Sequence, residues 1–297
     1  NKIDKLASGE KEWILTSGWN KSVMNADDYR AYVGGTSGLI YGYVNDGFYK
    51  VEDFEYFDSK SRTWKLKEGV VDSSPLSDTP RPGNAKFKKL TPVDPNSSNP
   101  YQLTEADRTV IGNTTPKFSG GFGLNATYKG FDLSMFFNFM YDFDVFNANK
   151  VMLTTWADNH ENNFGMEVAS DKRWRNFDDM GNEIRYSPEL LAEFNKNATM
   201  WNPTSIGKPI SMSYAVEDGS FLRLNSATLG YTLPQEWTKK AGLNKVRFYV
   251  AGSNLFTITG YSGYDPEVDI ATGLTPNIDN NRYPRSRTYT FGAQLTF

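Results

Sequence analysis

The sequence predicts an all-β protein whose strands form an antiparallel transmembrane β-barrel with long extracellular loops. Three observations lead to this prediction. The last twelve residues alternate without exception between an apolar, aromatic side and a small, polar side. The strand-like segments are joined by connections that are alternately short and long. No run of eighteen or more apolar residues occurs, which excludes a transmembrane helix.

Residues 286–297 are the clearest strand. Successive side chains of an extended strand point to opposite faces, so one face of this segment is apolar. That face carries Arg287, Tyr289, Phe291, Ala293, Leu295 and Phe297. At about 3.3 Å per residue and a tilt near 45°, the segment rises about 28 Å, close to the ~25 Å apolar band of an outer-membrane barrel. We expect it to be the barrel-closing strand, although the pattern alone also fits a half-buried strand of a soluble β-sandwich.

Composition narrows the classes of function. The mean hydropathy is -0.57, which a barrel tolerates because only alternate strand residues meet lipid and the loops are polar. Aromatic residues reach 15%, enough to supply rings at both membrane interfaces. The chain has no cysteine, so it has no disulfide framework and no thiolate chemistry. With a net charge of -3 and no basic stripe, no nucleic-acid partner is expected.

Five further strands follow from the same alternation. They are residues 36–51, 116–128, 131–142, 221–233 and 246–257. The clearest hairpin turns at Lys129 and Gly130. Asp132 and Asp142 lie on its second face, which suits a wet lumen better than a dry core. A short helix capped by Ser187 is the one helix we expect in the loops.

The connections between these strands sort by length. If the last strand runs inward, residues 36–51, 131–142 and 246–257 run outward and residues 116–128 and 221–233 run inward. Residues 129–130 and 234–245 are then short periplasmic turns, whereas residues 52–115, 143–214 and 258–285 are long external loops. This asymmetry is typical of outer-membrane barrels and is not expected of a β-sandwich. Six or seven strands cannot close a wide barrel, so we expect another part of the protein, or another chain, to supply the rest.

Several phrases of the sequence resemble the SusC family of TonB-dependent outer-membrane transporters. They are residues 106–113 (ADRTVIGN), 128–134 (YKGFDLS), 217–224 (EDGSFLRL), 229–234 (LGYTLP), 253–257 (SNLFT), 263–268 (GYDPEV) and 283–285 (YPR), with the closing strand after them. Each phrase alone is weak, but their order and spacing cover most of residues 36–297.

The resemblance implies that residues 1–297 are the carboxy-terminal portion of a barrel of about 22 strands, with the plug domain and amino-terminal strands absent. It also implies a SusD-like surface lipoprotein as partner, energy from TonB through the missing amino-terminal part, and import of oligosaccharides or peptides across the outer membrane of a Gram-negative, Bacteroidetes-like bacterium. The alternative is a non-transporting barrel or soluble β-sandwich with an adhesive or structural role.

Aromatic and polar residues of the predicted loops are the candidates for substrate binding. Sugars stack their apolar faces on rings, while their hydroxyls need amide, carboxylate or guanidinium partners. The candidates are Trp156, Asn159, Trp174, Arg175, Trp201, Asn202, Tyr261 and Tyr264. The alternative is that each tryptophan anchors its own loop or contacts the lipoprotein lid.

Catalysis has little support in the sequence. His160 is the only histidine, and neither a Gly-x-Ser-x-Gly motif nor a P-loop is present. We therefore expect no enzyme, and we interpret Asp178 and Asp179 as surface charge.

No resident cofactor is expected, although two loops are weak candidates for Ca²⁺. The SusC-like loop before residues 106–113 often resembles a calcium loop. Here Asn96, Ser98 and Asp107 take its first, third and last positions, but two acidic ligands and the turn glycine are missing. Residues 265–269 (DPEVD) either hold a hard cation or form a solvated turn that packs on Tyr261 and Tyr264.

Overall fold

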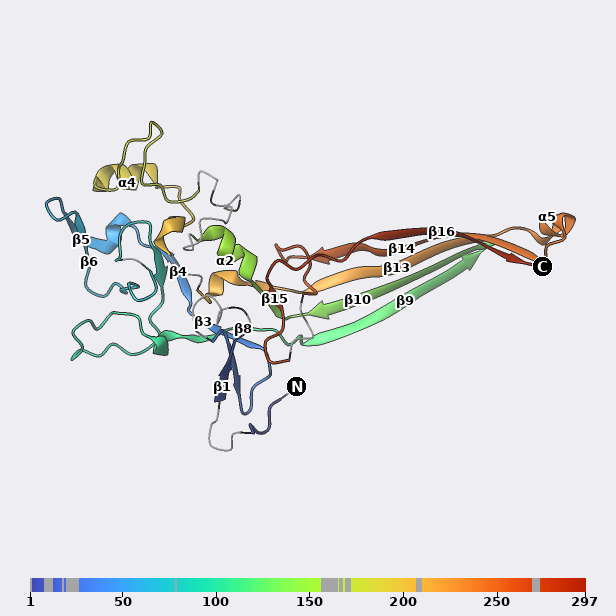
Figure 1. Ribbon diagram of the computed structural model, residues 1–297, viewed down its shortest axis with the longest axis horizontal. Helices are drawn as coiled ribbons and strands as arrows, with labels where there is room; N and C mark the ends of the chain where they lie inside the picture. The colour runs from blue at the N-terminus through green and yellow to red at the C-terminus, as the bar shows by residue number, and fades with distance from the viewer. Residues whose placement is uncertain are drawn as a thin grey trace. The chain divides into compact units, whose positions relative to one another are not determined.

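The computed structural model describes residues 2–7, 13–17, 19, 27–77, 79–155, 165, 168, 172–206, 210–268 and 273–297. The chain forms two compact units, each made of three separate stretches (Figure 1). The loop unit comprises residues 1–114, 146–216 and 269–280. The sheet unit comprises residues 115–145, 217–268 and 281–297. Within the described ranges, no helix is both long and apolar enough to cross a lipid bilayer.

The sheet unit is built on one antiparallel sheet of five long strands. In sheet order they are β9 (Phe118–Tyr128), β10 (Phe131–Tyr141), β13 (Phe221–Thr232), β14 (Lys245–Thr259) and β16 (Thr288–Thr296). They are 9 to 15 residues long, against the roughly 9–11 that a tilted strand needs to cross a bilayer. The sequence-predicted strands 116–128, 131–142, 221–233, 246–257 and 286–297 are therefore confirmed.

The strand register gives each face of this sheet one chemical character. One row across the sheet reads Ala126, Leu133, Leu229, Val250 and Phe291. The next row, on the other face, reads Asn125, Ser134, Thr228, Ala251 and Thr290. Hydrogen-bonded partners lie on the same face of a sheet, so the alternation of each strand adds up to one apolar and one largely polar surface.

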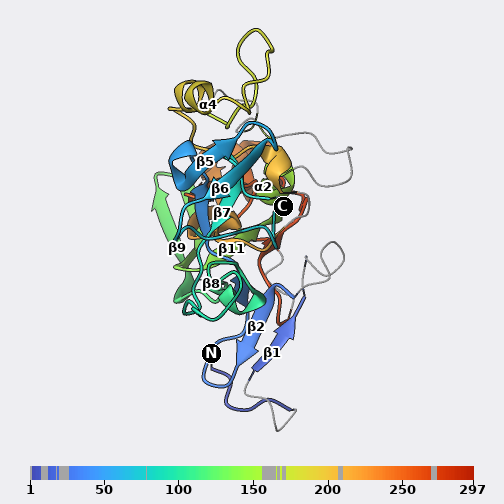
Figure 2. The ribbon, with the colours of Figure 1, turned by 90° about the vertical axis from the view of Figure 1, so that its left-hand side faces the viewer.

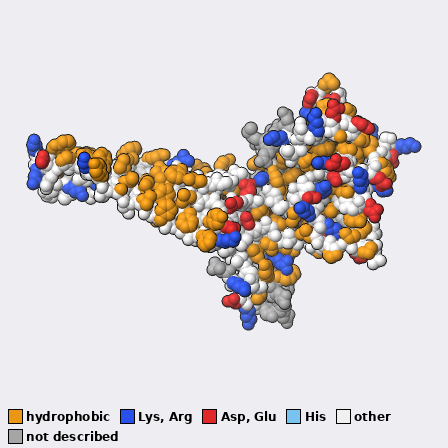
Figure 3. All heavy atoms as spheres, turned by 180° about the vertical axis from the view of Figure 1, so that it is seen from behind, with side chains coloured by type: hydrophobic (Ala, Val, Ile, Leu, Met, Phe, Trp, Pro, Cys, Tyr) orange, Lys and Arg blue, Asp and Glu red, His pale blue; other side chains and the backbone are white. Residues whose placement is uncertain are grey.

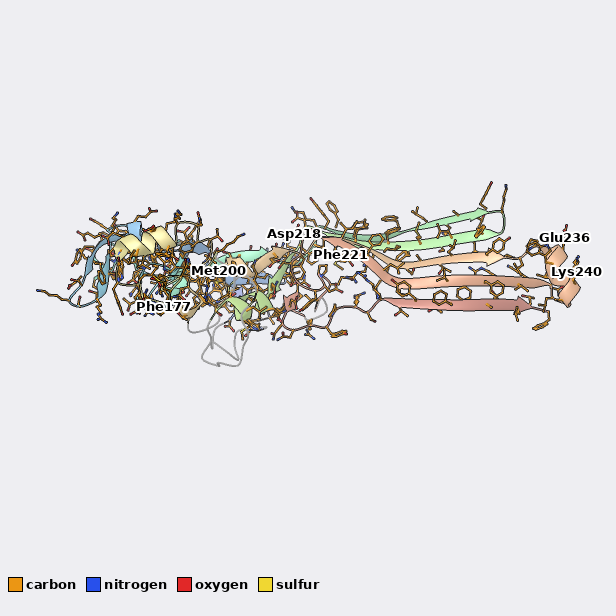
Figure 4. The ribbon with its side chains drawn as sticks, turned by 90° about the horizontal axis from the view of Figure 1, so that it is seen from above. Phe177, Met200, Asp218, Phe221, Glu236 and Lys240 are labelled. Atoms are coloured by element: carbon orange, nitrogen blue, oxygen red, sulfur yellow. The ribbon has the colours of Figure 1, made fainter. Side chains whose placement is uncertain are left out.

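The two ends of the sheet differ in their connections. At one end β9 meets β10 through Lys129 and Gly130, which both have positive φ, as a two-residue hairpin turn requires. At the same end β13 and β14 are joined through α5 (Gln235–Thr238) and η5 (Lys239–Ala241). Figure 4 labels Phe221 near one end of the sheet and Glu236 and Lys240 at the other. The long connections between the strands begin and end at the Phe221 end of the sheet.

The loop unit contains short strands and helices. A four-stranded sheet has the order β1 (Trp13–Thr16), β2 (Tyr29–Tyr32), β3 (Leu39–Gly42) and β8 (Thr109–Asn113). Two separate two-stranded sheets pair β4 (Asn45–Phe48) with β7 (Ala85–Phe87) and β5 (Phe54–Asp58) with β6 (Thr63–Leu66), and only the second is a hairpin. Figure 2 shows β5, β6 and α4 (Pro188–Phe194) of this unit.

Short elements complete the described structure. They are η1 (Val51–Asp53), η2 (Glu105–Asp107), α2 (Ala148–Thr154), η3 (Pro203–Ser205), η4 (Ser213–Ala215) and β15 (Ile278–Asp279). β11 (Asp144–Asn147) and β12 (Val216–Asp218) lie where the chain passes between the stretches of the two units. β11 pairs with β15 in parallel through Phe146 and Ile278.

The loop unit has its own hydrophobic cores. The larger one gathers aromatic and aliphatic side chains from all three stretches of the unit, including Tyr29, Phe87, Phe146, Trp201 and Ile278. A smaller core contains Trp174, Ile184 and Leu191. Because side chains far apart in sequence meet in these cores, the loop unit is a folded body rather than a set of independent loops.

One of our expectations about this region is wrong. Residues 36–51 do not form a membrane-crossing strand, since they form β3 and β4 in the loop unit. Leu39 and Ile40 are both buried although they point to opposite faces, so this segment sits inside a core where neither face meets a solvent. The long sheet therefore has five strands rather than six or seven. The described parts of the long connections 52–115 and 143–214 contain short strands and helices, and α4 begins after Ser187 as predicted.

Candidate functional site

The five-stranded sheet presents one apolar face along its strands. Large side chains on it are mostly solvent-accessible, with Phe291 80% and Phe297 83% exposed. Figure 3 shows hydrophobic side chains gathered along this sheet. Soluble monomers rarely leave apolar patches larger than a few hundred Å² uncovered. A surface of this kind needs lipid or protein against it.

The opposite face of the sheet carries a charged pair that spans three strands. Arg247 of β14 donates from Nε to Asp132 of β10 at 2.9 Å and from Nη2 at 2.5 Å. The strand between them supplies Gly230, where an added Cβ would lie 2.3 Å from Arg247. A larger residue at this position would displace the guanidinium from its path across β13. A paired carboxylate and guanidinium on this face fit contact with water, as the sequence predicts for a lumen.

Both edges of the sheet end in unpaired strands. β9 and β16 are the first and last strands of the sheet order in the described part of the chain. In a bilayer an open row of backbone N–H and C=O groups costs several kcal/mol per group. Within a bilayer, both edge strands of this sheet would therefore need a partner strand.

A buried ion cluster fixes the connection that follows β14. Arg223 of β13 is 3% exposed and pairs with Asp265 at 2.5 Å and with Glu267 at 2.9 Å. Arg285 pairs with Glu267 at 3.3 Å. Burial alone would raise the pKa of Asp265, but the hydrogen bond and charge of Arg223, together with hydrogen bonds from the backbone N–H groups of Glu267 and Arg285, outweigh burial and lower the pKa. These four residues tie the motifs at 217–224, 263–268 and 283–285 into one contact.

The turn at residues 265–269 was expected either to hold a hard cation or to be solvated, and its described residues fit neither alternative. Its described carboxylates are buried against arginine, so the cation they hold is a guanidinium, and the turn is not solvated. Tyr261 is buried with Phe143, Phe221 and other apolar residues in a small core of the sheet unit. Tyr264 is 80% exposed. Tyr264 is accordingly the one of the two tyrosines whose ring is accessible to a ligand.

The described candidate tryptophans lie inside the cores of the loop unit. Trp174 is buried with Ile184 and Leu191. Trp201 is also buried, with its indole N–H donating to the carbonyl of Thr154 at 3.3 Å. Neither ring is accessible for stacking on a sugar, and both act as anchors of their segments. Trp156, Asn159 and His160 lie outside the described residues.

The polar candidates beside these tryptophans have different surroundings. Arg175 pairs with Asp179 at 2.6 Å, and its backbone N–H donates to Asn195. Asp178 closes its own turn by accepting hydrogen bonds from residues 180–182. Asn202 lines a cavity of about 380 Å³ in the loop unit. The sequence pattern did not predict this cavity.

Asp107 organises the end of the loop that resembles a calcium site. Its side chain is completely buried and accepts hydrogen bonds from Leu90, Thr91 and Thr104 and from the ammonium of Lys89. Burial raises the pKa of Asp107, but these hydrogen bonds outweigh it and hold the pKa far below its usual range. Protein donors thus surround both carboxylate oxygens.

The other two metal candidates lie away from such a network. Asn96 and Ser98 are exposed, and Asn96 donates its backbone N–H to Asp94 at 2.9 Å. In the described part of the chain, no three His, Cys, Asp or Glu side chains are grouped closely enough to hold a metal ion.

The chain resembles known transporters in sequence and in structure. It matches no protein-family model. The TonB-dependent receptor P3 of Formosa agariphila is 32% identical to it over 303 residues, which cover 100% of this chain and 26% of the receptor. The TonB-dependent receptor SusC of Bacteroides thetaiotaomicron is 37% identical over 86 residues, 28% of this chain and 8% of the receptor.

A solved structure of the RagAB peptide transporter has the same fold over 100% of this chain and 26% of the transporter chain, with a TM-score of 0.66 and 22% identity. The RagAB peptide importer in its "open-open" state gives a TM-score of 0.63. The chain spans about a quarter of the length of these relatives. The resemblance carried by the sequence motifs and the predicted fold class are both confirmed.

Proposed function

Because this chain is a relative of the SusC-like TonB-dependent transporters, we propose that it is the carboxy-terminal part of the barrel of an outer-membrane importer. The importer takes up oligosaccharides or peptides and draws its energy from TonB. A plug domain and the other barrel strands come from residues outside 1–297, and a SusD-like lipoprotein is the surface partner. The relatives are named as receptors and transporters, which supports transport rather than catalysis.

One observation carries this proposal: the exposed apolar face that all five long strands share. The rows across the sheet keep apolar side chains on one side from β9 to β16. In a bilayer such a face contacts lipid chains, which removes the cost of exposing it to water. The unpaired edges at β9 and β16 support the same conclusion, since a barrel of about 22 strands would pair both.

Each part of the chain then has a task. The sheet forms a section of the barrel wall, and its polar face lines the passage. On that face Asp132 and Arg247 neutralise each other, so neither charge is unpaired. The loop unit holds the long connections in one folded body, which gives a lid a firm surface to close on. Substrate would bind between that surface and the lid, and would pass inward when the plug moves.

The experiment that tests this function starts with the full-length protein purified in detergent from outer membranes. Intact mass and partner identification should reveal a chain much longer than 297 residues together with a co-purifying lipoprotein. Uptake of glycans and peptides should then stop when TonB is deleted. Uptake that continues without TonB, or a lone water-soluble species, would contradict the proposal and favour a structural or adhesive β protein.

A further inference from the structure

We propose that the loop unit contains a binding pocket for an anionic oligosaccharide, one that carries carboxylate or sulfate ester groups. The pocket is the cavity of about 380 Å³ that Asn202 lines, within the size range of small-ligand sites. Its walls come from the β5–β6 hairpin, from residues 79–84, from residues 176–186 and from the η3 turn. The inference rests on the proposed function for its biological role, because import gives an external pocket its purpose.

Positive charge is the first feature of this pocket. Three arginines line it, Arg62, Arg81 and Arg185, and no Asp or Glu is among its described lining residues. Arg185 pairs with Glu183 at 2.7 Å. Arg62 and Arg81 are exposed and form no ion pair with a described residue. The pocket therefore keeps an excess of positive charge at neutral pH, where guanidinium groups are always protonated.

Two of the three arginines, Arg62 and Arg185, are also held in place before a ligand arrives. The guanidinium of Arg62 lies 4.8 Å from the ring centroid of Tyr186, and that of Arg185 lies 6.0 Å from the same centroid. Phe57 stacks against Tyr186 at 6.1 Å and packs against Trp64 at 4.9 Å. Two like charges near one ring repel each other, and a bound anion relieves that repulsion. Planar guanidiniums bind carboxylate and sulfate oxygens in pairs.

The remaining lining fits the hydroxyl groups of a sugar. Asn84, Asn176 and Asn202 bring side-chain amides to the pocket wall. The carbonyl oxygen of Asn202 accepts from Thr204, whereas no described residue accepts a hydrogen bond from its amide nitrogen. Trp64 adds an aromatic surface. Fixed cations, amides and a ring together favour a charged carbohydrate over a purely apolar ligand.

The test measures binding to the full-length detergent-purified protein by calorimetry. The probes are trigalacturonate for carboxylates, a sulfated carrageenan tetrasaccharide for sulfate esters, neutral maltotriose and the peptide triglutamate. We expect one of the two anionic sugars to bind, more weakly as NaCl rises, and maltotriose to bind at least tenfold more weakly. The two anionic arms distinguish a carboxylate from a sulfate ester.

Substitutions then assign the binding to this pocket. Arg62→Gln and Arg81→Gln change exposed side chains without ion pairs, so the fold should be kept. Each should weaken binding about tenfold, as expected for the loss of one charged hydrogen bond. Arg173→Gln, an exposed arginine of the same unit outside the pocket, should leave affinity unchanged. Thermal unfolding of each variant checks the fold.

Several outcomes would overturn the inference. They are tighter binding of triglutamate than of either anionic sugar, equal binding of maltotriose, or binding that Arg62→Gln and Arg81→Gln leave intact. These outcomes leave the proposed import function untouched if TonB-dependent uptake is observed. If no uptake depends on TonB, while anionic sugars still bind through these arginines, the import function is overturned and the pocket is kept.

Discussion

The two units of this chain place their aromatic side chains in opposite ways. In the loop unit Tyr49 and Phe87 are completely buried, each inside a protein core. In the sheet unit Phe291 and Phe297 are among the most exposed residues of the protein. Both units draw on the same kinds of residue, so composition does not decide the difference. What differs is the solvent for which each surface is built: water around the loop unit and lipid around the sheet.

The units also treat buried polar groups differently. The loop unit surrounds Asp107 with neutral donors and one ammonium, and Tyr49 donates its hydroxyl to the carbonyl of Val71 at 2.5 Å. Burial raises the pKa of Tyr49 to about 12. The sheet unit instead buries a cluster of full charges around Arg223. Each of these three buried groups, Asp107, Tyr49 and Arg223, has a polar partner, as a low-dielectric environment requires.

The largest expected effect comes from breaking that charge cluster. Arg223→Gln leaves Asp265 and Glu267 buried without their main cation, which costs about 3–5 kcal/mol. Residues 260–287 should become sensitive to protease while the long strands stay paired. Arg285→Gln is the matched control, since Arg285 is partly exposed and Arg223 still pairs with Asp265 and Glu267 in that variant, so the loss should be smaller. Equal protection in both variants would show that the cluster does not hold this connection.

A charge on the lipid-facing side sharpens the contrast between the two faces of the sheet. Leu229→Arg puts a guanidinium on the apolar face, at a cost of up to about 2–4 kcal/mol near the bilayer midplane. We expect less folded protein in the outer membrane, measured by heat-modifiable migration in gels. Thr228→Arg, one residue away on the polar face, should assemble nearly normally. Similar losses for both variants would contradict the assignment of faces.

A single buried carboxylate sharpens the account of the loop unit. Asp107→Asn leaves some of the surrounding N–H and O–H donors without an acceptor, which costs about 1–3 kcal/mol. Thermal unfolding of the loop unit should shift downward while the sheet keeps its heat resistance. Asn96→Ala is the control, because Asn96 is exposed and outside this network. An unchanged unfolding temperature for Asp107→Asn would contradict the central place of this carboxylate.

The same carboxylate predicts a pH dependence. Because the pKa of Asp107 is lower in the folded state than the ordinary value of about 3.9, its contribution to stability is fully present above that value. The contribution is lost as the pH falls below about 4 toward the folded-state pKa. In wild type the unfolding temperature of the loop unit should fall in that range, and in Asp107→Asn the fall should be shallower. Parallel curves would rule out Asp107 as the cause.

The smallest expected effect concerns the cap of α4. The Ser187 hydroxyl accepts from the N–H of Leu190 at 3.4 Å, a long bond, so Ser187→Ala should cost about 0.5–1 kcal/mol. The measurement is the rate of proteolysis within residues 187–196. Ser98→Ala removes an exposed serine elsewhere in the loop unit and should change nothing. If Ser187→Ala lowers the stability of the loop unit more than Asp107→Asn does, α4 is held mainly by its cap rather than by Leu191 in the core.

Local pattern was enough to predict the long strands. β9 and β16 alternate cleanly because each of their faces meets one environment along its whole length, and β10 departs from the pattern only at Phe136 and Met140 on its polar face. The signal fails at residues 36–51, where Leu39 and Ile40 are buried on opposite faces. The alternation rule assumes that one face of a strand packs on a core and the other meets solvent, whereas both faces of β3 are buried. The same reasoning explains why only the Ser187 cap, a local signal, was found in the loop unit.

The contacts of the candidate site depended on distances along the chain that pattern does not encode. Arg223 meets Asp265, and Arg62 lies near Tyr186, although neither pair is close in sequence. The tryptophans drew attention as ligand-binding residues because of their chemistry. Trp174 and Trp201 are instead core residues, because burying a large aromatic side chain in the folded loop unit is more favourable than exposing it to water. Trp64 and Arg185 carried no motif that marked them as pocket residues.

The central claim, that one face of the five-stranded sheet contacts lipid, has a direct measurement. The given sequence has no cysteine, so single cysteines at Thr228, Leu229, Thr290 and Phe291 can carry spin labels in the full-length protein, once any cysteine outside residues 1–297 is removed. In bilayers, labels at Leu229 and Phe291 should be relaxed by oxygen, and those at Thr228 and Thr290 by a water-soluble nickel reagent. Equal accessibility at neighbouring positions, or the reverse pattern, would contradict the account.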